Sequence, residues 1–313
     1  MAFTRVPEEQ AVKVEANGKY LTTVQFESVQ AAYDFLLGEI KRGKGAFAIP
    51  KTEEFARSIG CTSIKASCGD KADIMMEIHE PETGMDLIQG FSIKSKLGSA
   101  STLVNASEAT NCVYRLVGSV TPELVSKVNV MFEGKSKTKV RDGLSMLRLA
   151  GVELQFIDTF RPIFHNNLVL VDSNMPTIVG ELLKIYNMDG ISNTATLIEE
   201  LTKRNPLGYD DCTNYPYYEQ KIKKLLVSYA LGMKSGYRWD GKEEANGGYI
   251  VVKEDGEVVC IHIFDRMTFE DYLVKNTKLD TASTTKHNFA RIYKEEGEYR
   301  LRLNLQIRFD ERC

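Results

Sequence analysis

The chain contains 313 residues, of which 43% are hydrophobic and 27% are charged. This balance, with only 23 glycines and 8 prolines, excludes collagen-like, low-complexity and intrinsically disordered proteins. At roughly 150 residues per domain, the length corresponds to about two domains, although one large domain with insertions is equally compatible. The formal charge of −3 neither indicates nor excludes a nucleic-acid partner, because the local field at a site decides that question.

The sequence shows no targeting or membrane-spanning segment. Its N-terminal stretch lacks the apolar core of a signal peptide, and no run approaches the roughly 18 apolar residues that a spanning helix needs. The six cysteines form no CxxC pair, and four histidines are too few to favour a zinc cluster. We therefore expect a cytoplasmic protein with free thiols and no membrane contact.

Hydrophobic periodicity changes repeatedly between helical and strand spacing, which is typical of a mixed α/β fold. The turn-forming residues 81–84 and the Asp255-Gly256 pair predict hairpin turns. In chain order, the pattern predicts helices at 24–41 and 51–59, strands at 64–67, 73–79 and 85–95, a helix at 102–117, strands at 152–158 and 168–171, helices at 175–186, 196–204 and 217–233, a hairpin at 248–264 and a final strand at 299–309.

Two charged residues occupy adjacent strands of the first predicted hairpin. Asp73 opens one strand, and Lys94 lies 21 residues later on the next. At one end of a sheet, the carboxylate can hold a hard divalent cation and the lysine can position a water molecule against a phosphate. Phosphodiester hydrolysis needs both roles. The spacing resembles that of the PD-(D/E)xK nucleases, in which the first acid lies on one strand and the (D/E)xK residues lie on the next.

The motif departs from that superfamily at one position, because Ser92 stands where the acid before the lysine is expected. A Mg²⁺ ion usually takes one or two carboxylates, so we expect a second acid from elsewhere. Glu108, on the helix predicted after the hairpin, resembles the migrated acid of a variant of the superfamily. Glu77, four residues after Asp73 on the same strand face, is the alternative. The resemblance also implies the backbone carbonyl of Ile93 as a metal ligand, although each of these residues, taken alone, is also typical of a solvated surface.

Longer segments resemble the HpaII-type restriction endonucleases. These are residues 90–99, 101–105, 110–111, 272–287 and 303–309, which follow one another in the expected order along the chain. The resemblance implies a restriction-endonuclease-like core, a mixed central sheet flanked by helices. It implies a type II enzyme that uses Mg²⁺ to hydrolyse both strands of duplex DNA at a short sequence, with CCGG as the suggested target. It also implies a partner methyltransferase in the same restriction–modification system.

The resemblance suggests a division of the chain and an oligomeric state. Residues 1–170 would form the nuclease core with the catalytic hairpin. Residues 171–313 would form a helical region followed by a β-rich region that contacts DNA, although a single domain is equally compatible. Cleavage of both strands at a palindromic site fits a two-fold symmetric homodimer.

Polar and basic residues after the hairpin and near the C-terminus are candidate DNA contacts. The turn at 98–101 precedes a predicted helix, whose free N–H groups would bind a phosphate, although an ordinary helix cap explains its serine equally well. Residues 275–291 are rich in hydroxyl, amide and basic groups, and arginine and amide side chains, beginning with Arg300, alternate along the final strand. An ordinary polar loop and a solvent-facing strand have the same appearance. The candidates are Ser99, Ser101, Asn105, Lys278, Asp280, Ser283, Thr284, Lys286, His287, Arg302, Asn304, Gln306 and Arg308.

Two other functions compete with a nuclease. The serine in Ser-Ile-Lys is compatible with a catalytically inactive or partner-dependent DNA-binding protein on the same scaffold. An unrelated α/β enzyme is the other alternative, but the sequence contains no GxGxxG, P-loop, GxSxG or HExxH motif. The sequence does not fix the bases that are read or the position of the cut.

Overall fold

The protein has a mixed α/β fold, as the sequence predicts. The computed structural model describes residues 2–6, 11–16, 19–25, 71–80, 85–95, 101–252, 258–263 and 265–310. The chain divides into two compact units. Unit 1 comprises Met1–Ala100 and Glu244–Ile263, and unit 2 comprises Ser101–Glu243 and Phe264–Cys313. Residues 170 and 171, where the sequence suggests a boundary, end a helix inside unit 2.

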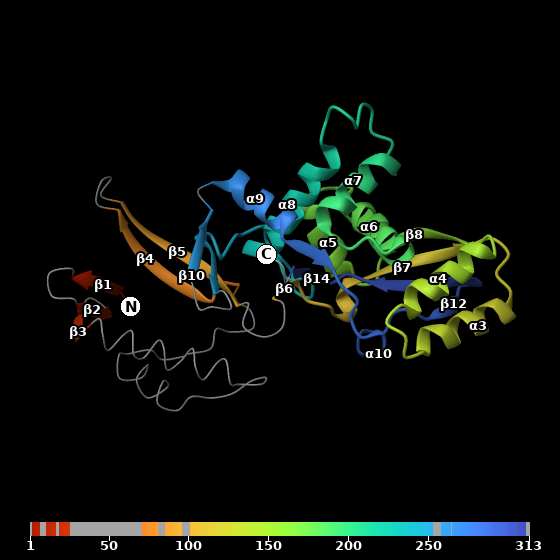
Figure 1. Ribbon diagram of the computed structural model, residues 1–313, viewed down its shortest axis with the longest axis horizontal. Coiled ribbons are helices and arrows are strands. Elements are labelled where there is room, and N and C mark those ends of the chain that lie inside the picture. Colours follow the sequence, from red (N-terminus) through yellow and green to blue (C-terminus); the bar gives the residue numbers. More distant parts are fainter. Residues whose placement is uncertain are drawn as a thin grey trace. The chain divides into compact units, whose positions relative to one another are not determined.

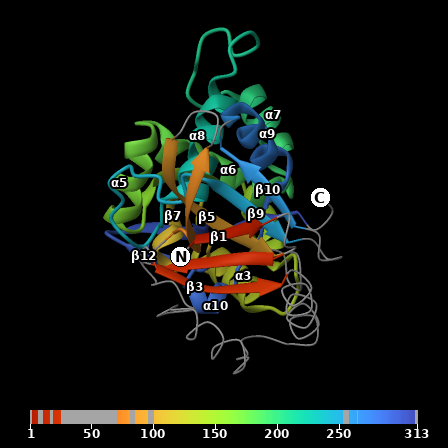
Figure 2. The ribbon, with the colours of Figure 1, turned by 90° about the vertical axis from the view of Figure 1, so that its left-hand side faces the viewer.

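Unit 1 begins with three antiparallel strands, β1 (Ala2–Val6), β2 (Ala11–Ala16) and β3 (Lys19–Gln25), in the order β1-β2-β3 (Figure 2). The periodicity of the sequence does not predict these strands. It places residues 24 and 25 at the start of a helix, which is wrong because they end β3. The rest of that predicted helix, the predicted helix at 51–59 and the predicted strand at 64–67 lie outside the described residues.

A mixed four-stranded sheet in unit 1 carries Glu77, Ser92, Ile93 and Lys94, and Asp73 lies immediately before its strand β4. Its order is β10-β9-β5-β4. The two predicted hairpins are confirmed as antiparallel pairs, while β5 and β9 run parallel to each other. Both predicted turns lie outside the described residues. The strands are β4 (Ile74–Glu80), β5 (Met85–Ser95), β9 (Gly248–Val252) and β10 (Val258–His262).

Unit 2 contains two antiparallel sheets. In the four-stranded sheet the order is β12-β13-β7-β8, and in the three-stranded sheet it is β11-β14-β6. The predicted strand at 152–158 is confirmed as β8. The strands are β6 (Thr102–Val104), β7 (Asn111–Val117), β8 (Glu153–Thr159), β11 (Thr277–Leu279), β12 (Ile292–Glu295), β13 (Glu298–Asn304) and β14 (Ile307–Phe309).

Figure 1 shows the helices of unit 2, and two of their ends have ordinary capping residues. Thr121 accepts a hydrogen bond from Leu124 N at the start of α3, and Gly190 ends α6 with a φ of 75°, a left-handed conformation that glycine adopts without strain. No helix in the described part of the chain is long and apolar enough to cross a bilayer. The helices are α3 (Pro122–Glu133), α4 (Lys139–Leu149), α5 (Pro162–Val171), α6 (Met175–Asp189), α7 (Thr194–Arg204), α8 (Tyr217–Leu231), α9 (Arg266–Lys275), α10 (Thr284–His287) and the short 3₁₀ helix η1 (Glu108–Thr110).

Three further predictions about local structure, all in unit 2, are wrong. Residues 102–117 form β6, η1 and β7 instead of a helix, because β7 is a central strand buried on both faces and therefore lacks strict alternation. Residues 168–171 end the helix α5 instead of forming a strand. Residues 299–309 are two strands in different sheets, interrupted at 305–306.

The core of unit 2 forms where α6 packs against β7 and β8. Tyr114 of β7 is fully buried, its ring lies edge-on to that of Phe156, and its hydroxyl donates a hydrogen bond to the carbonyl of Gly180 at 2.7 Å. A β-carbon at Gly180 would lie 2.5 Å from the Phe156 ring, so only glycine permits this approach of helix and sheet. Cys112, beside Tyr114, is a buried free thiol, and its burial raises the pKa of the thiol.

We predict that Tyr114→Phe lowers the free energy of unfolding by roughly 1 kcal/mol, because it removes one buried hydrogen bond while keeping the ring. Urea unfolding followed by circular dichroism measures the change. Tyr215→Phe, at a tyrosine that is 57% exposed, is the matched control and should leave the midpoint unchanged. Equal midpoints for wild type and Tyr114→Phe would contradict a stabilising role of this hydroxyl.

Candidate functional site

Asp73 lies immediately before β4, beside the middle of β5. Its backbone N–H donates to the Phe91 carbonyl at 2.8 Å, which continues the hairpin ladder. Its carboxylate oxygen Oδ2 accepts hydrogen bonds from the backbone N–H of Ile93 at 2.7 Å and from the hydroxyl of Ser92 at 3.1 Å. The side chain is exposed. The neighbouring strand therefore orients the carboxylate while leaving it accessible to a ligand.

Lys94 joins this carboxylate through Ser92. Its Nζ donates to the Ser92 hydroxyl at 3.0 Å, and Ser92 is 1% exposed. Three predicted site residues, Asp73, Ser92 and Lys94, thus form one continuous hydrogen-bonded chain. Within it the serine hydroxyl accepts from the lysine and donates to the aspartate.

Tyr249, to which no sequence motif points, borders the same three residues. Tyr249 pairs with Ser92 across the parallel strands β5 and β9, and Lys94 Nζ lies 5.1 Å from the centroid of its ring. Burial lowers the pKa of Lys94, and the negative charge of Asp73 partly opposes this shift. The amine therefore lies in a dry setting between an aromatic ring and a hydroxyl, where it gives up a proton more readily than an exposed lysine.

The loop before β9 fixes the position of β5. Asn246 Oδ1 accepts from the Gly90 N–H at 2.8 Å, and the Gly247 N–H donates to the Gly90 carbonyl at 2.7 Å. A β-carbon at Gly90 would lie 2.2 Å from the carbonyl oxygen of Glu244, so a side chain there would displace the loop. Glycine at this position lets the two segments lie in direct contact.

The structure corrects the expected setting of the second acid. Glu108 lies in η1 of unit 2, not on a long helix, and its Oε2 accepts a hydrogen bond from Arg161 at 2.8 Å. This bond lowers the pKa of the Glu108 carboxyl group. Glu77 lies on β4 in unit 1, and its side chain is outside the described part of the structure.

The donor set around Asp73 suits a small divalent cation. Mg²⁺ usually takes one or two carboxylates and completes its octahedral shell with water and substrate phosphate. Asp73 is exposed, and its Oδ1 has no hydrogen-bond partner among the described residues. The described residues contain no cluster of three or more histidine, cysteine, aspartate or glutamate side chains that could hold a metal alone. The residues therefore fit an ion that is held partly by the substrate.

Two amides on the predicted DNA-contact strand are buried, and one of them is held by hydrogen bonds within the protein. Asn304 and Gln306, which the sequence offers as DNA contacts, are only 5% and 7% exposed. The Asn304 side-chain N–H groups donate to Ser107 O at 2.7 Å, Thr110 Oγ1 at 3.1 Å and Asn111 Oδ1 at 2.7 Å. The strand is interrupted between β13 and β14, and this break ends the alternation that the sequence suggests.

Several other predicted DNA contacts already have partners within the protein. Arg308 pairs with Asp280 at 3.0 Å, and Lys278 lies 3.6 Å from Asp310. Ser283 caps α10, and Thr284 accepts a hydrogen bond from Lys139 at 3.0 Å. These side chains help to hold the C-terminal region of unit 2 together.

The remaining candidates differ in exposure. Ser101 precedes a strand, so the expected helix N-terminus for binding phosphate is absent there. Lys286 and Asn105 are exposed. His287 is half-buried, and its burial and the positive charge of Lys286 both lower the pKa of its imidazole. Ser99 lies outside the described residues. Arg302 is half-buried, and its guanidinium carbon lies 3.7 Å from the centroid of the Phe160 ring.

Comparison with known proteins adds an independent result. The family model of the HpaII restriction endonuclease matches residues 3–309. The chain is 38% identical over 292 residues to the type II restriction enzyme HpaII of Haemophilus parainfluenzae, and this match covers 92% of the chain and 79% of that enzyme. No solved structure matches the chain.

We predict that Asn304→Ala lowers the free energy of unfolding by about 2–3 kcal/mol, because it leaves buried acceptors without their donor. Asn105→Ala removes the same side chain from an exposed position and should change stability by less than about 0.5 kcal/mol. Denaturant titration of both variants measures the difference. A stability of Asn304→Ala equal to that of Asn105→Ala would show that the buried amide is not structural.

Proposed function

The chain belongs to the HpaII restriction endonuclease family and is a type II site-specific deoxyribonuclease, and from this premise we propose that Asp73, Ser92 and Lys94 form its Mg²⁺-dependent catalytic centre. The observation that carries the proposal is the hydrogen-bonded chain from Lys94 through Ser92 to Asp73. It joins a group that can bind a metal to a group that can act on water, within the sheet of unit 1.

Each residue has a distinct proposed role. The Asp73 carboxylate would hold the Mg²⁺ ion, which, when bound, supplies positive charge to the scissile phosphate and its leaving oxygen. Lys94 orients the attacking water and accepts its proton, a role that its lowered pKa favours. Ser92 holds the lysine at a fixed distance from the carboxylate. The Ile93 carbonyl is a further proposed ligand.

The second carboxylate stays a proposal with two candidates. Glu108 would have to exchange its ion pair with Arg161 for the metal. Glu77 lies four residues after Asp73, a backbone separation of roughly 13 Å in an extended strand, so it would need a water molecule or a second ion between them. Glu108→Gln and Glu77→Gln separate these candidates. Only the substitution of the residue that binds the metal should raise the Mg²⁺ concentration that cleavage requires.

We further propose that the substrate is duplex DNA containing CCGG and that the enzyme acts as a homodimer. A two-fold axis presents two identical centres to the two strands of a palindrome. A methyltransferase of the same specificity would protect the DNA of the host. Such a system acts on DNA in the cytoplasm, where we propose that the enzyme resides.

Digestion of plasmid DNA tests the catalytic centre. We expect discrete fragments with Mg²⁺ and none with EDTA, and mapping of the fragment ends identifies the site. Asp73→Asn and Lys94→Ala should each lower the cleavage rate by at least 100-fold, because each removes a group that acts directly in the reaction.

The matched control for Lys94→Ala is Lys127→Ala, which removes an exposed lysine of α3 and should cleave at the wild-type rate. Cleavage that persists in Asp73→Asn and Lys94→Ala would refute the proposed centre. Sequence-specific binding by the wild-type chain without any cleavage would support the alternative, a DNA-binding protein that is inactive or needs a partner.

A further inference from the structure

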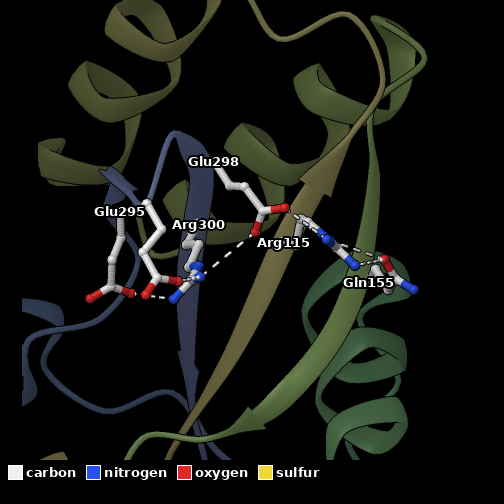
Figure 3. A network of polar contacts seen from close by, with 6 residues as sticks. Arg115, Gln155, Glu295, Glu298 and Arg300 are labelled. Carbon is white, nitrogen blue, oxygen red and sulfur yellow. Dashed lines mark hydrogen bonds and ion pairs between the residues drawn. The ribbon is translucent and has the colours of Figure 1, made fainter.

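Three arginines alternate along the C-terminal strands of unit 2, and two of them are neutralised by carboxylates. Arg300 on β13 forms ion pairs with Glu295, with Glu296 at 2.7 Å and with Glu298 at 3.7 Å (Figure 3). Arg308 on β14 pairs with Asp280. Arg302, two residues after Arg300, has no ion pair among the described residues.

Aromatic rings restrain the Arg302 side chain instead. Its guanidinium carbon lies 3.7 Å from the centroid of the Phe160 ring and 5.0 Å from that of Tyr293. Its Nε is buried and has no hydrogen-bond partner within the described structure. Stacking of this kind limits rotation of the planar group and leaves its N–H edge to bind a ligand.

The guanidinium borders a hollow of about 390 Å³ in unit 2, which we call the Arg302 pocket. None of its lining residues is acidic, and the exposed Arg291 adds a second cation that has no ion pair in the described part of the chain. A neighbouring hollow of about 250 Å³ shares three of these residues and extends to α10. The Arg302 pocket is lined by Asn129, Asn288, Arg291, Ile292, Tyr293 and Arg302.

The wall of the Arg302 pocket is firmly held. The side-chain amide of Asn129 bonds both backbone groups of Ile292, at 2.7 and 3.0 Å. The N–H of Ala290 donates to the Arg302 carbonyl at 2.9 Å, so the wall is attached directly to β13. Asn288 and Ala290 have φ values of 52° and 54°, and alanine rarely adopts this left-handed conformation. Such strain is characteristic of segments with a specific functional geometry.

We propose that the Arg302 pocket reads a guanine of the substrate DNA, with the Arg302 guanidinium donating two hydrogen bonds to the O6 and N7 acceptors of the base. This proposal rests on the proposed function, because it takes duplex DNA as the substrate. A rigid planar fork with a free edge matches two adjacent acceptors, which guanine and a phosphate group both offer. The restrained, half-buried position of Arg302 favours the base, whereas the exposed Arg291 suits the adjacent phosphate.

Equilibrium binding without a metal ion tests the assignment separately from cleavage. The probes are a fluorescent duplex with one CCGG site, the same duplex with 7-deazaguanine at each guanine in turn, and the same duplex with a methylphosphonate at each phosphate of the site in turn. For the wild-type chain we expect one 7-deazaguanine to weaken binding roughly tenfold, because it removes the N7 acceptor. Arg302→Ala removes every donor of the side chain, so it should bind the normal and the modified duplex equally.

Arg300→Ala is the matched control, since it makes the same change two residues away at an arginine with carboxylate partners. It should retain the wild-type sensitivity to 7-deazaguanine, and a thermal melt checks that both variants are folded. If Arg302→Ala retains that sensitivity, or loses sensitivity only to a methylphosphonate, the assignment of Arg302 to a guanine is overturned. A wild-type chain that does not discriminate between any of the probes also overturns it. The wild-type chain could also show a sensitivity to 7-deazaguanine that depends on Arg302 without ever cleaving DNA. That result would refute the proposed catalysis and support the assignment of Arg302 to a guanine.

Discussion

The hydroxyl group of Ser92 connects the two charged side chains on which the catalytic proposal depends. It is nearly inaccessible to water, donates to Asp73 and accepts from Lys94. A carboxylate at this position would accept a hydrogen bond from the lysine but could donate none to the aspartate, and it would place a second negative charge beside the first. Serine keeps the two groups connected without adding charge. As a result, the positive charge of a bound ion must be balanced largely by the DNA phosphate or by a carboxylate from another segment.

The arginines of unit 2 show how one side-chain type serves different purposes on the same strand. Arg300 lies among three glutamates, and the neighbouring Arg115 bonds both Glu298 and Gln155. Among the described residues, Arg302 has aromatic neighbours instead of an ion pair, and its charge contributes to the lowered pKa of the Glu108 carboxyl group. A net charge of −3 is compatible with the two arginines that line the Arg302 pocket, because carboxylates such as those beside Arg300 are placed elsewhere on unit 2.

The sequence alone predicts the features that depend on local patterns. The helices α6, α7 and α8 and the paired strands β4 and β5 lie close to their predicted positions, because each has a regular apolar period. The grouping of Asp73 with Lys94 follows from the same hairpin. Residues 102–117 were not predictable in this way, since a strand buried on both faces has no alternation. The burial of Asn304 and the place of Tyr249 depend on partners far away in the sequence, and no local pattern encodes such contacts.

The parallel pairing of β5 with β9 has a consequence for biosynthesis. The aspartate and the lysine emerge from the ribosome early, but Tyr249 and the strand beside Ser92 follow only after the 143 residues of Ser101–Glu243. Until then the nascent hairpin has an unpaired edge, and Lys94 lacks the aromatic surface that helps to exclude water. A cell that makes this enzyme therefore completes the proposed centre only after most of the chain has been translated, and incomplete products of interrupted synthesis lack it.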